Sequence, residues 1–457
     1  MDARVTDLLA ETGLSEADGI DDVVVAGADP VLAAKFPIGE AAATAMAGCA
    51  AAAAHIHASR TGESQSVRVD VTKAAASLIS YALQSLDDKP TPRAAEGNPL
   101  VALYPCRDGR WVHVHGAFPR LADPTLEVLD CSPDRDSVAS AVARWDAQDL
   151  EDALAERRTC GAKVRTSNEW REHPQGIALT DLPRVELLRI GDAPAEPLAA
   201  AERPLQGVRV LDLTRMLAGP ACGRMLAEHG ADVLAITGRD LPNPLPFVID
   251  TGHGKRSAFL DLEKPDEAER LRALAAQSDV FVQGYRTGAL ARRGFGPEDL
   301  AALRPGIVYV SINCYGHDGP FVQRPGWEQL AQSVAGIAAV QGTEDRPQLL
   351  PAAACDYTTG YLAALGTMAA IARRCVEGGS WHVRASLART AMWFDDLGPR
   401  CDPSEATGLS GISEAMLQRQ TGYGALRYLG PVAELSRTPG NWDLPTAPLG
   451  SHEPVWN

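Results

Sequence analysis

One acidic residue stands out in the alanine-rich stretch LLPAAACDYTTGYLAALGTMAAIARR, which spans residues 349–374. Asp356 lies where an apolar helix is predicted to begin. A carboxylate at that place can cap the helix by accepting backbone N–H groups, which is its commonest role there. It can also act as a nucleophile that attacks an activated acyl group and forms a covalent intermediate. The two roles compete, because an acylated carboxylate no longer caps as an anion.

Other side chains that could do chemistry follow no catalytic or metal-binding pattern. The nine cysteines are scattered, and none forms a CxxC pair or accompanies a histidine cluster. Such a set indicates reduced thiols that are buried as small apolar residues. Cys355 differs from the others only in being adjacent to Asp356. His253 and His317 lie in predicted loops, where a structural role is more common than a catalytic one, and no metal site is predicted.

Length and charge restrict the classes of protein to which the chain can belong. A chain of 457 residues is too long for one simple core, so two or three domains are expected. The net charge of -16 argues against nucleic-acid binding, which needs a basic surface. No apolar run reaches the roughly 18 residues of a membrane span. The acidic N-terminus has no hydrophobic signal segment, so a cytoplasmic location is expected.

The elements around Asp356 alternate between strand-like and helix-like patterns over residues 207–396. This alternation predicts βαβ units and an α/β fold with an open parallel, Rossmann-like sheet that has helices on both faces. Such sheets bind ligands at the carboxyl ends of their strands. Residues 327–342 are predicted to form one helix, and residues 238–251 a proline-rich loop. The predicted strands are 207–213, 231–236, 255–262, 279–285, 306–316 and 383–387.

The rest of the chain predicts three further segments. Residues 1–190 are expected to form an N-terminal helix followed by a smaller α+β domain, with a hairpin turn at Asp108-Gly109. The proline- and alanine-rich residues 191–206 are typical of a linker. Residues 397–457 are predicted to be a proline-rich, irregular tail that packs on the other domains.

A weak internal echo links the two ends of the chain. GESQSVRVDV at residues 62–71 parallels GGSWHVRASL at 378–387, and an alanine-rich helix is predicted before each. Superposing the two stretches places Glu40 over Asp356. Chance similarity between two alanine-rich helices is an alternative explanation, and Glu40 is then inert.

Residues 204–390 resemble the class III CoA-transferase family, which includes formyl-CoA transferase, carnitine CoA-transferase and α-methylacyl-CoA racemase. The resemblance rests on VRVLDLTRMLAGPACGRMLAEHGADVLAI, VQGYRTGALARRGFGPEDLAALRPGIVYVSINCYGHDGP and CDYTTGYLAALGTMAAIARR, in family order. YPCRDGRWVHVH resembles the opening of the family's small domain, which here precedes the large domain. Family members form interlocked dimers, so the resemblance implies a homodimer.

The resemblance implies that CoA, supplied as an acyl-CoA substrate, is moved to a carboxylic acid acceptor without a metal. Asp356 takes the place of the family's nucleophile, and the N-terminus of its helix is expected to stabilise an anionic intermediate. Lys255-Arg256 is also family-like, although it can serve only to fix the start of its strand. The residues that match family contacts to CoA, or that could meet its phosphates, are Arg215, Met216, Leu217, Ala218, Arg239, Gly284, Tyr285, Arg286, Ala289 and Arg292.

Some positions depart from the family pattern and leave other activities open. Thr237 stands where the family usually has Glu, Gly284 stands where it has Asn, and the loop after Thr237 is short. Trp327-Glu328 fills the place of the racemase His-Asp pair, and Trp cannot exchange a proton, which disfavours two-base racemisation. An acyl-CoA isomerase or lyase that uses Asp356 or Glu328 remains an alternative, as does an inactive CoA-binding relative.

Overall fold

A seven-stranded sheet forms the centre of the molecule. The structure is a computed structural model, and it describes residues 2–14, 19–91, 97–398 and 400–456. The strand order is β11-β10-β9-β12-β13-β14-β8, in which only the edge strand β8 is antiparallel to its neighbour. The six parallel strands thus have the order 3-2-1-4-5-6, which is that of doubly wound nucleotide-binding folds. Their bounds are β9 Arg209–Leu213, β10 Asp232–Thr237, β11 Lys255–Phe259, β12 Val280–Gln283, β13 Val308–Asn313, β14 Ser380–Ser386 and β8 Glu186–Gly191.

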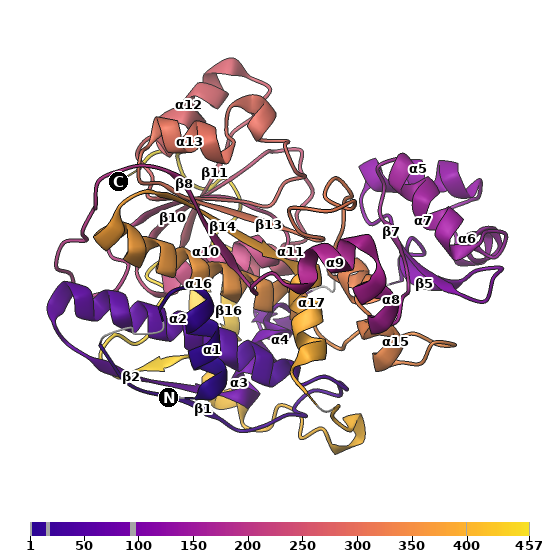
Figure 1. Cartoon of the computed structure of the whole chain (residues 1–457), viewed down its shortest axis with the longest axis horizontal. Helices are drawn as coiled ribbons and strands as arrows, with labels where there is room; N and C mark the ends of the chain where they lie inside the picture. Colours follow the sequence, from indigo (N-terminus) through magenta and orange to yellow (C-terminus); the bar gives the residue numbers. More distant parts are fainter. Residues whose placement is uncertain (1, 15–18, 92–96, 399, 457) are drawn as a thin grey trace.

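Helices cover both faces of this sheet, as the α/β pattern predicted (Figure 1). Along β13, Val308 and Val310 face the core that contains α10 and α16, whereas Tyr309 faces α12 and α13. This alternation follows from the two-residue repeat of a strand, and it makes both faces apolar because both are buried. The bounds are α10 Ala218–Glu228, α11 Leu245–Thr251, α12 Pro265–Ala275, α13 Pro297–Leu303, α14 Glu328–Val334, α15 Ile337–Gln341, α16 Ala354–Glu377 and α17 Leu387–Asp396.

A smaller α+β unit stands at one side of the sheet (Figure 1). The predicted hairpin is present, and Gly109 in its turn has φ +76. Its helices pack on the three-stranded sheet around a separate apolar core. The unit contains β5 Val101–Pro105, β6 Trp111–His115, β7 Gly161–Lys163, α5 Pro119–Leu129, α6 Arg135–Val142 and α7 Ala147–Glu156, and α8 Ser167–Glu172 and α9 Pro174–Thr180 lead back to the large sheet.

The N-terminal segment repeats the geometry around Asp356. Helix α2, Ile38–Thr61, is 24 residues long like α16, and the two helices pack against each other. Each is followed by a strand that pairs with one parallel and one antiparallel neighbour, β2 in one copy and β14 in the other. Each strand ends at a residue whose side chain caps the next helix, Asp70 or Ser386. The echo is therefore structural, and chance similarity of two helices does not explain it. The other elements of this segment are α1 Ala3–Glu11, β1 Ile20–Ala26, β2 Gln65–Asp70, α3 Val71–Ser77 and α4 Ser80–Leu83.

The last segment of the chain contains strands as well as irregular structure. A hairpin of β15 Met416–Thr421 and β16 Gly424–Leu429 joins the short strands β3 Ser85–Leu86 and β4 Lys89–Pro90, and β17 Glu434–Leu435 pairs with β2. The proline-rich end then runs along the large sheet, where the Arg256 guanidinium donates to the carbonyl of Val455.

Three elements differ from the predictions. Gly336 adopts φ +88 and divides the predicted helix of residues 327–342 into α14 and α15, because this left-handed conformation interrupts the helical hydrogen bonds. The predicted loop of residues 238–251 contains helix α11. Residues 186–191, predicted at the end of the N-terminal domain, form the edge strand β8 of the large sheet.

Candidate functional site

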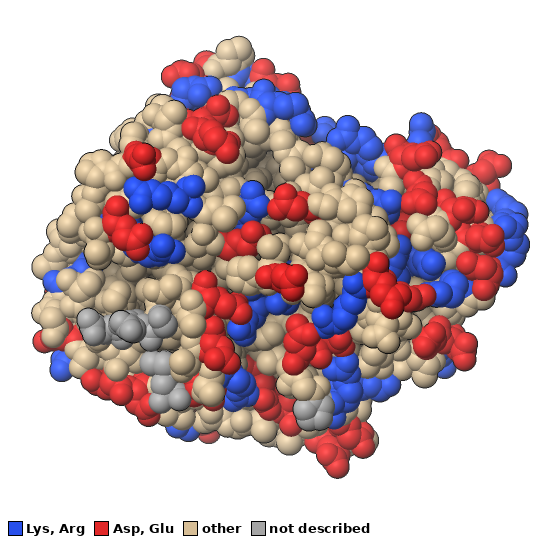
Figure 2. Space-filling model, viewed as in Figure 1, with Lys and Arg blue, Asp and Glu red and all other residues tan. Residues whose placement is uncertain are grey.

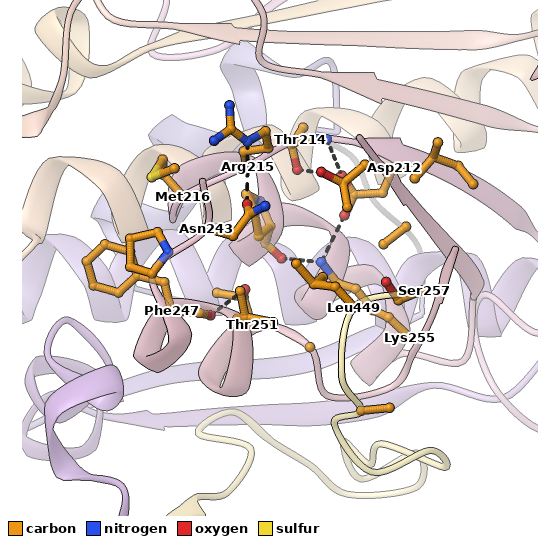
Figure 3. Close-up of a pocket in the computed structure, with 18 residues that line it drawn as sticks. Asp212, Thr214, Arg215, Met216, Asn243, Phe247, Thr251, Lys255, Ser257 and Leu449 are labelled. Carbon is orange, nitrogen blue, oxygen red and sulfur yellow. Dashed lines mark hydrogen bonds and ion pairs between the residues drawn. The ribbon is translucent and has the colours of Figure 1, made fainter. Parts of the chain in front are cut away.

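A buried ion pair fixes the loop that follows the central strand β9. The Lys255 Nζ donates to the Asp212 carboxylate at 2.8 Å and to the carbonyl of Pro220 at 2.7 Å. The other Asp212 oxygen accepts the backbone N–H of Thr214 at 3.0 Å (Figure 3). Because both charges are buried and paired, the ion pair holds the loop in one position. Lys255 thus positions this loop, in addition to starting its own strand.

The same loop contains a strained backbone residue. Met216 has φ +70, a left-handed conformation that a non-glycine residue adopts only at a cost of about 1 kcal/mol or more. It lines a pocket of about 60 Å³ between the β9 loop and α11 (Figure 3). Strain of this kind is often retained where a backbone must approach a ligand.

Helix α16 begins without a cap from its own N-cap residue, Ala353. Glu328, the first residue of α14, supplies the cap instead. Its carboxylate accepts the backbone N–H groups of Cys355, at 3.0 Å, and of Asp356. Gln332 donates a further hydrogen bond to Glu328 at 2.6 Å. Asp356 therefore lies in the first turn but is not the cap, and the N–H groups expected to stabilise an intermediate are already bonded to Glu328.

The Asp356 side chain is half-buried and receives no hydrogen bond from another residue in the described part of the chain. Burial raises its pKa well above the usual value, and the nearby Glu328 charge raises it further. Burial also raises the pKa of Glu328, although its three hydrogen-bond donors oppose that shift by stabilising the anion. The hydrogen-bond donors thus favour the ionised form of Glu328, whereas no donor among the described residues offsets the raised pKa of Asp356.

Buried polar contacts hold the first turn of α16 against two other helices. The Tyr357 hydroxyl donates to the Asp250 carboxylate of α11 at 2.7 Å. Arg224 of α10 donates to the same carboxylate oxygen at 2.7 Å. These contacts position Asp356 relative to the β9 loop, since α10 follows that loop directly.

A cleft of about 1370 Å³ lies between the carboxyl ends of the large sheet and the small α+β unit. It opens between the loops after β9 and β12, where the strand order reverses and where ligands bind in doubly wound folds. Its volume exceeds that of typical pockets for drug-sized ligands, so it can accommodate a large one. Of the predicted residues, Arg215, Arg239, Gly284, Tyr285, Arg286 and Ala289 line this cleft.

The other predicted contact residues lie elsewhere. Met216 lines the neighbouring small pocket. Leu217 and Ala218 are buried where α10 begins, and their side chains line neither cavity. Arg292 is exposed on a short 3-10 turn and lines neither cavity, whereas the adjacent Arg293 does line the cleft.

The cleft is basic although the whole chain is acidic. Its lining includes nine Arg or Lys side chains and four Asp or Glu side chains. On the face drawn in Figure 2, by contrast, the two signs are interspersed. Three of the cleft arginines, Arg120, Arg157 and Arg158, come from the small unit and were not predicted. No local pattern marks them, because only the packing of the two units brings them opposite the large sheet.

Asp356 itself does not line either cavity. Trp327 and Cys314 line the cleft, and Trp327 directly precedes the Glu328 that caps the Asp356 helix. Trp327 packs against His115, with ring centroids 5.6 Å apart, and against Phe118 at 5.7 Å. Trp327 thus contacts residues from the small unit where the chain passes from the cleft to the cap of α16.

The second copy of the acid-bearing turn differs in its charge balance. Glu40 occupies the third position of α2, as Asp356 does in α16, and the Asp29 carboxylate accepts its backbone N–H at 2.8 Å. However, Arg4 forms an ion pair with the Glu40 carboxylate. Glu40 is thus neutralised by a partner, whereas Asp356 has none among the described residues.

The described residues include no group of three His, Cys, Asp or Glu side chains arranged to hold a metal ion. None of the helices in the described ranges is both long enough and apolar enough to cross a membrane.

The fold defines a class of site, namely a ligand cleft where the strand order of a doubly wound sheet reverses. Comparison with known proteins gives a family that is consistent with such a site. The model of CoA-transferase family III matches residues 8–195 and 205–397. The chain therefore belongs to CoA-transferase family III.

Among curated relatives, an acyl-CoA transferase of Gibberella moniliformis is 36% identical over 329 residues, which cover 65% of this chain and 58% of the relative. The acetyl-coenzyme A transferase nodX of Hypoxylon pulicicidum is 30% identical over 322 residues, which cover 65% of this chain and 54% of the relative. The chain thus spans little more than half the length of these relatives. A CAIB/BAIF family protein from Brucella suis has a crystal structure with a TM-score of 0.40 and 28% identity, covering 42% of this chain and 55% of that one.

Proposed function

We propose that this protein transfers CoA from an acyl-CoA donor to a carboxylic acid acceptor, with Asp356 as the nucleophile. The observation that carries the proposal is the division of roles between two carboxylates at the start of α16. Glu328 caps the helix, so the oxygen atoms of Asp356 have no structural hydrogen bonds to give up. Asp356 is half-buried and has no partner among the described residues, and its helix is capped by the residue that follows the cleft residue Trp327. Such an acid is suited to covalent catalysis.

The proposed reaction starts when the Asp356 carboxylate attacks the thioester carbonyl. A C–O bond forms and the C–S bond breaks. CoA departs as the thiolate, and a mixed anhydride of Asp356 and the donor acyl group remains. The thiolate then attacks the Asp356 carbonyl, which gives an aspartyl-CoA thioester and releases the donor acid. The acceptor carboxylate attacks the carbonyl of this thioester, so a C–O bond forms, the C–S bond breaks, and a second mixed anhydride and CoA thiolate result. The thiolate then attacks the acceptor carbonyl of this anhydride, which gives the acceptor acyl-CoA and releases the Asp356 carboxylate. No water, metal or redox partner is consumed.

The charge of the cleft supports this assignment. CoA is polyanionic, and an acidic protein needs a local basic surface to hold it. Arg239 and Arg286 are exposed in the cleft and have no carboxylate partner among the described residues, so they are available for phosphate groups. Arg is suited to this task because its planar fork can donate two parallel hydrogen bonds. Tyr285 lies beside them and offers a flat surface for a heteroaromatic ring.

Transfer of ¹⁸O tests the proposal. Acetyl-CoA and succinyl-CoA serve as donors, with ¹⁸O-labelled carboxylic acids as acceptors. The mechanism moves one labelled oxygen from the acceptor to Asp356 and then, in the next turnover, into the released donor acid. Mass spectrometry should find ¹⁸O both in the peptide that contains Asp356 and in the released donor acid. Label derived only from solvent water would indicate a hydrolase, and exchange of the α-proton without CoA transfer would indicate an isomerase; either result would overturn the proposal.

A further inference from the structure

Two arginines line the cleft from opposite units of the fold and lie close enough for the charge of one to act on the other. Arg120 is the second residue of α5 in the small unit, and Arg215 lies in the loop after β9 in the large sheet. Arg120 follows Phe118, whose ring packs on Trp327, the residue before the helix cap Glu328. The wall of the small unit that carries Arg120 thus packs on the residue that precedes the cap of α16.

Neither guanidinium is neutralised. Within the described part of the chain, Arg120 has no hydrogen bond or ion pair, and Arg215 donates only to the neutral oxygens of Asn243 and Pro242. Burial lowers the pKa of Arg215, the nearby Tyr285 hydroxyl opposes this shift, and the positive charge of Arg120 lowers the pKa further. Two like charges held close together without a counter-charge are unfavourable, and an anion placed between them would relieve the repulsion.

The surrounding structure keeps this arrangement in place. The Arg286 guanidinium donates to the carbonyl of Arg158 at 3.1 Å and so joins the large sheet to the small unit. Arg158 has φ +57, a strained conformation for a non-glycine residue, at the point where the chain turns towards the cleft. The two walls are therefore fixed relative to each other by a contact next to the cleft arginines.

We propose that Arg120 and Arg215 together form an anion subsite that closes on one anionic group of the bound substrates. The group is either a phosphate of CoA or the distal carboxylate of a dicarboxylic acyl group, since both offer oxygens to two guanidinium groups. This inference rests on the proposed function for the presence of CoA, but the subsite is made of side chains that the transfer chemistry does not use. Arg120 is a specificity-determining residue in this account.

Binding measured by calorimetry separates the subsite from the transfer reaction. CoA, 3′-dephospho-CoA, succinyl-CoA and propionyl-CoA are titrated into the wild-type chain, R120Q, R215Q, the double variant and R135Q. Arg135 is an exposed arginine of the small unit outside the cleft, so it serves as the matched control. Losing a charged hydrogen bond should weaken binding about tenfold or more in R120Q. R135Q should bind as the wild type does.

The pattern of losses identifies the source of the anion. If R120Q loses affinity for CoA but not for 3′-dephospho-CoA, the subsite takes the 3′-phosphate. If it loses affinity for both, the subsite takes the diphosphate, and if it loses affinity only for succinyl-CoA, it takes a distal carboxylate. In each case the double variant should lose less than the sum of the single variants, because both arginines share one ligand. Unchanged binding of all four ligands by R120Q, or strictly additive losses, would overturn the subsite and leave the proposed function intact. Failure of the wild-type chain to bind CoA would instead overturn the proposed function.

Discussion

Asp356 and Glu328 lie close together in a largely buried region, but their carboxylates differ in the hydrogen-bond donors that surround them. Glu328 has its oxygens bonded to two backbone N–H groups and to Gln332, which stabilise its negative charge. Asp356 has no such donors among the described residues, and its pKa is raised by burial and by Glu328. Two acids whose surroundings separate their protonation states commonly have different roles. Here one acid organises the helix and the other is left for chemistry.

Glu328→Gln should shift the pH dependence of the reaction. The attacking form of Asp356 is its carboxylate, so kcat/KM should rise with pH as Asp356 loses its proton, above the usual range for Asp. Removing the Glu328 charge removes one cause of the raised pKa, while the single glutamine oxygen can still accept one of the two helix N–H groups. We therefore expect the acidic limb of the profile to move to lower pH.

Steady-state assays across pH, with Glu344→Gln as an exposed control, measure this shift. The control should keep the wild-type profile. An acidic limb that stays in place in Glu328→Gln, or that moves to higher pH, would show that Glu328 does not set the protonation of the nucleophile.

At the scale of elements, small residues allow the helices around the site to pack closely. Gly360 of α16 lies against the start of α10, and an added Cβ there would be 2.5 Å from the Ala218 carbonyl oxygen and 2.8 Å from the Ala221 Cβ. Gly48 of α2 occupies a comparable mid-helix position. However, its nearest neighbours are the ends of two leucine side chains, both at 3.1 Å.

Gly360→Ala should destabilise the fold by about 1–3 kcal/mol, because its closest contact is backbone that cannot move without displacing α10. Gly48→Ala should be neutral, or stabilising by up to about 1 kcal/mol, since flexible side-chain ends can shift and alanine favours a helix. Urea unfolding of both variants checks this difference. Equal stabilities for the two variants would argue against the close approach of α10 and α16.

Much of this arrangement could be predicted from the sequence, because it depends on local patterns. The alternation of strand-like and helix-like patterns predicted the parallel sheet, and the apolar, alanine-rich run that follows Asp356 predicted its position at the start of a helix. The Glu328 cap could not be predicted, since it joins residues 28 positions apart through tertiary packing. The break at Gly336 depends on a backbone angle that no neighbouring residue type demands. Arg120 was missed because its role arises only from the placement of the small unit.

At the scale of the whole molecule, charge is distributed unevenly. The chain carries a net charge of -16, yet nine cationic and four acidic side chains line the cleft. Both walls of this cleft come from one chain, the small unit from its N-terminal part and the sheet from its C-terminal part. A polyanionic ligand is thus repelled by the molecule at long range and attracted within the cleft.

CoA binding should accordingly weaken as salt concentration rises, in spite of the acidic net charge. Between about 50 and 200 mM salt we expect a loss of roughly fivefold, which corresponds to about 1 kcal/mol of screened attraction. Pantetheine, which lacks the phosphates, should bind independently of salt. Calorimetric titrations of both ligands measure this contrast, and tighter CoA binding at high salt would show that the net charge outweighs the basic cleft.

The central claim, that Asp356 carries the covalent intermediate, is tested most directly by trapping it. The protein is incubated with acyl-CoA and hydroxylamine, and its peptides are mapped by mass spectrometry. Wild-type protein and Glu40→Gln should both acquire a hydroxamate on the peptide that contains Asp356, because Glu40 is paired with Arg4. Asp356→Asn should acquire none and should lose CoA transfer. An adduct on Glu328, Glu40 or any residue other than Asp356, or full transfer activity in Asp356→Asn, would contradict the account.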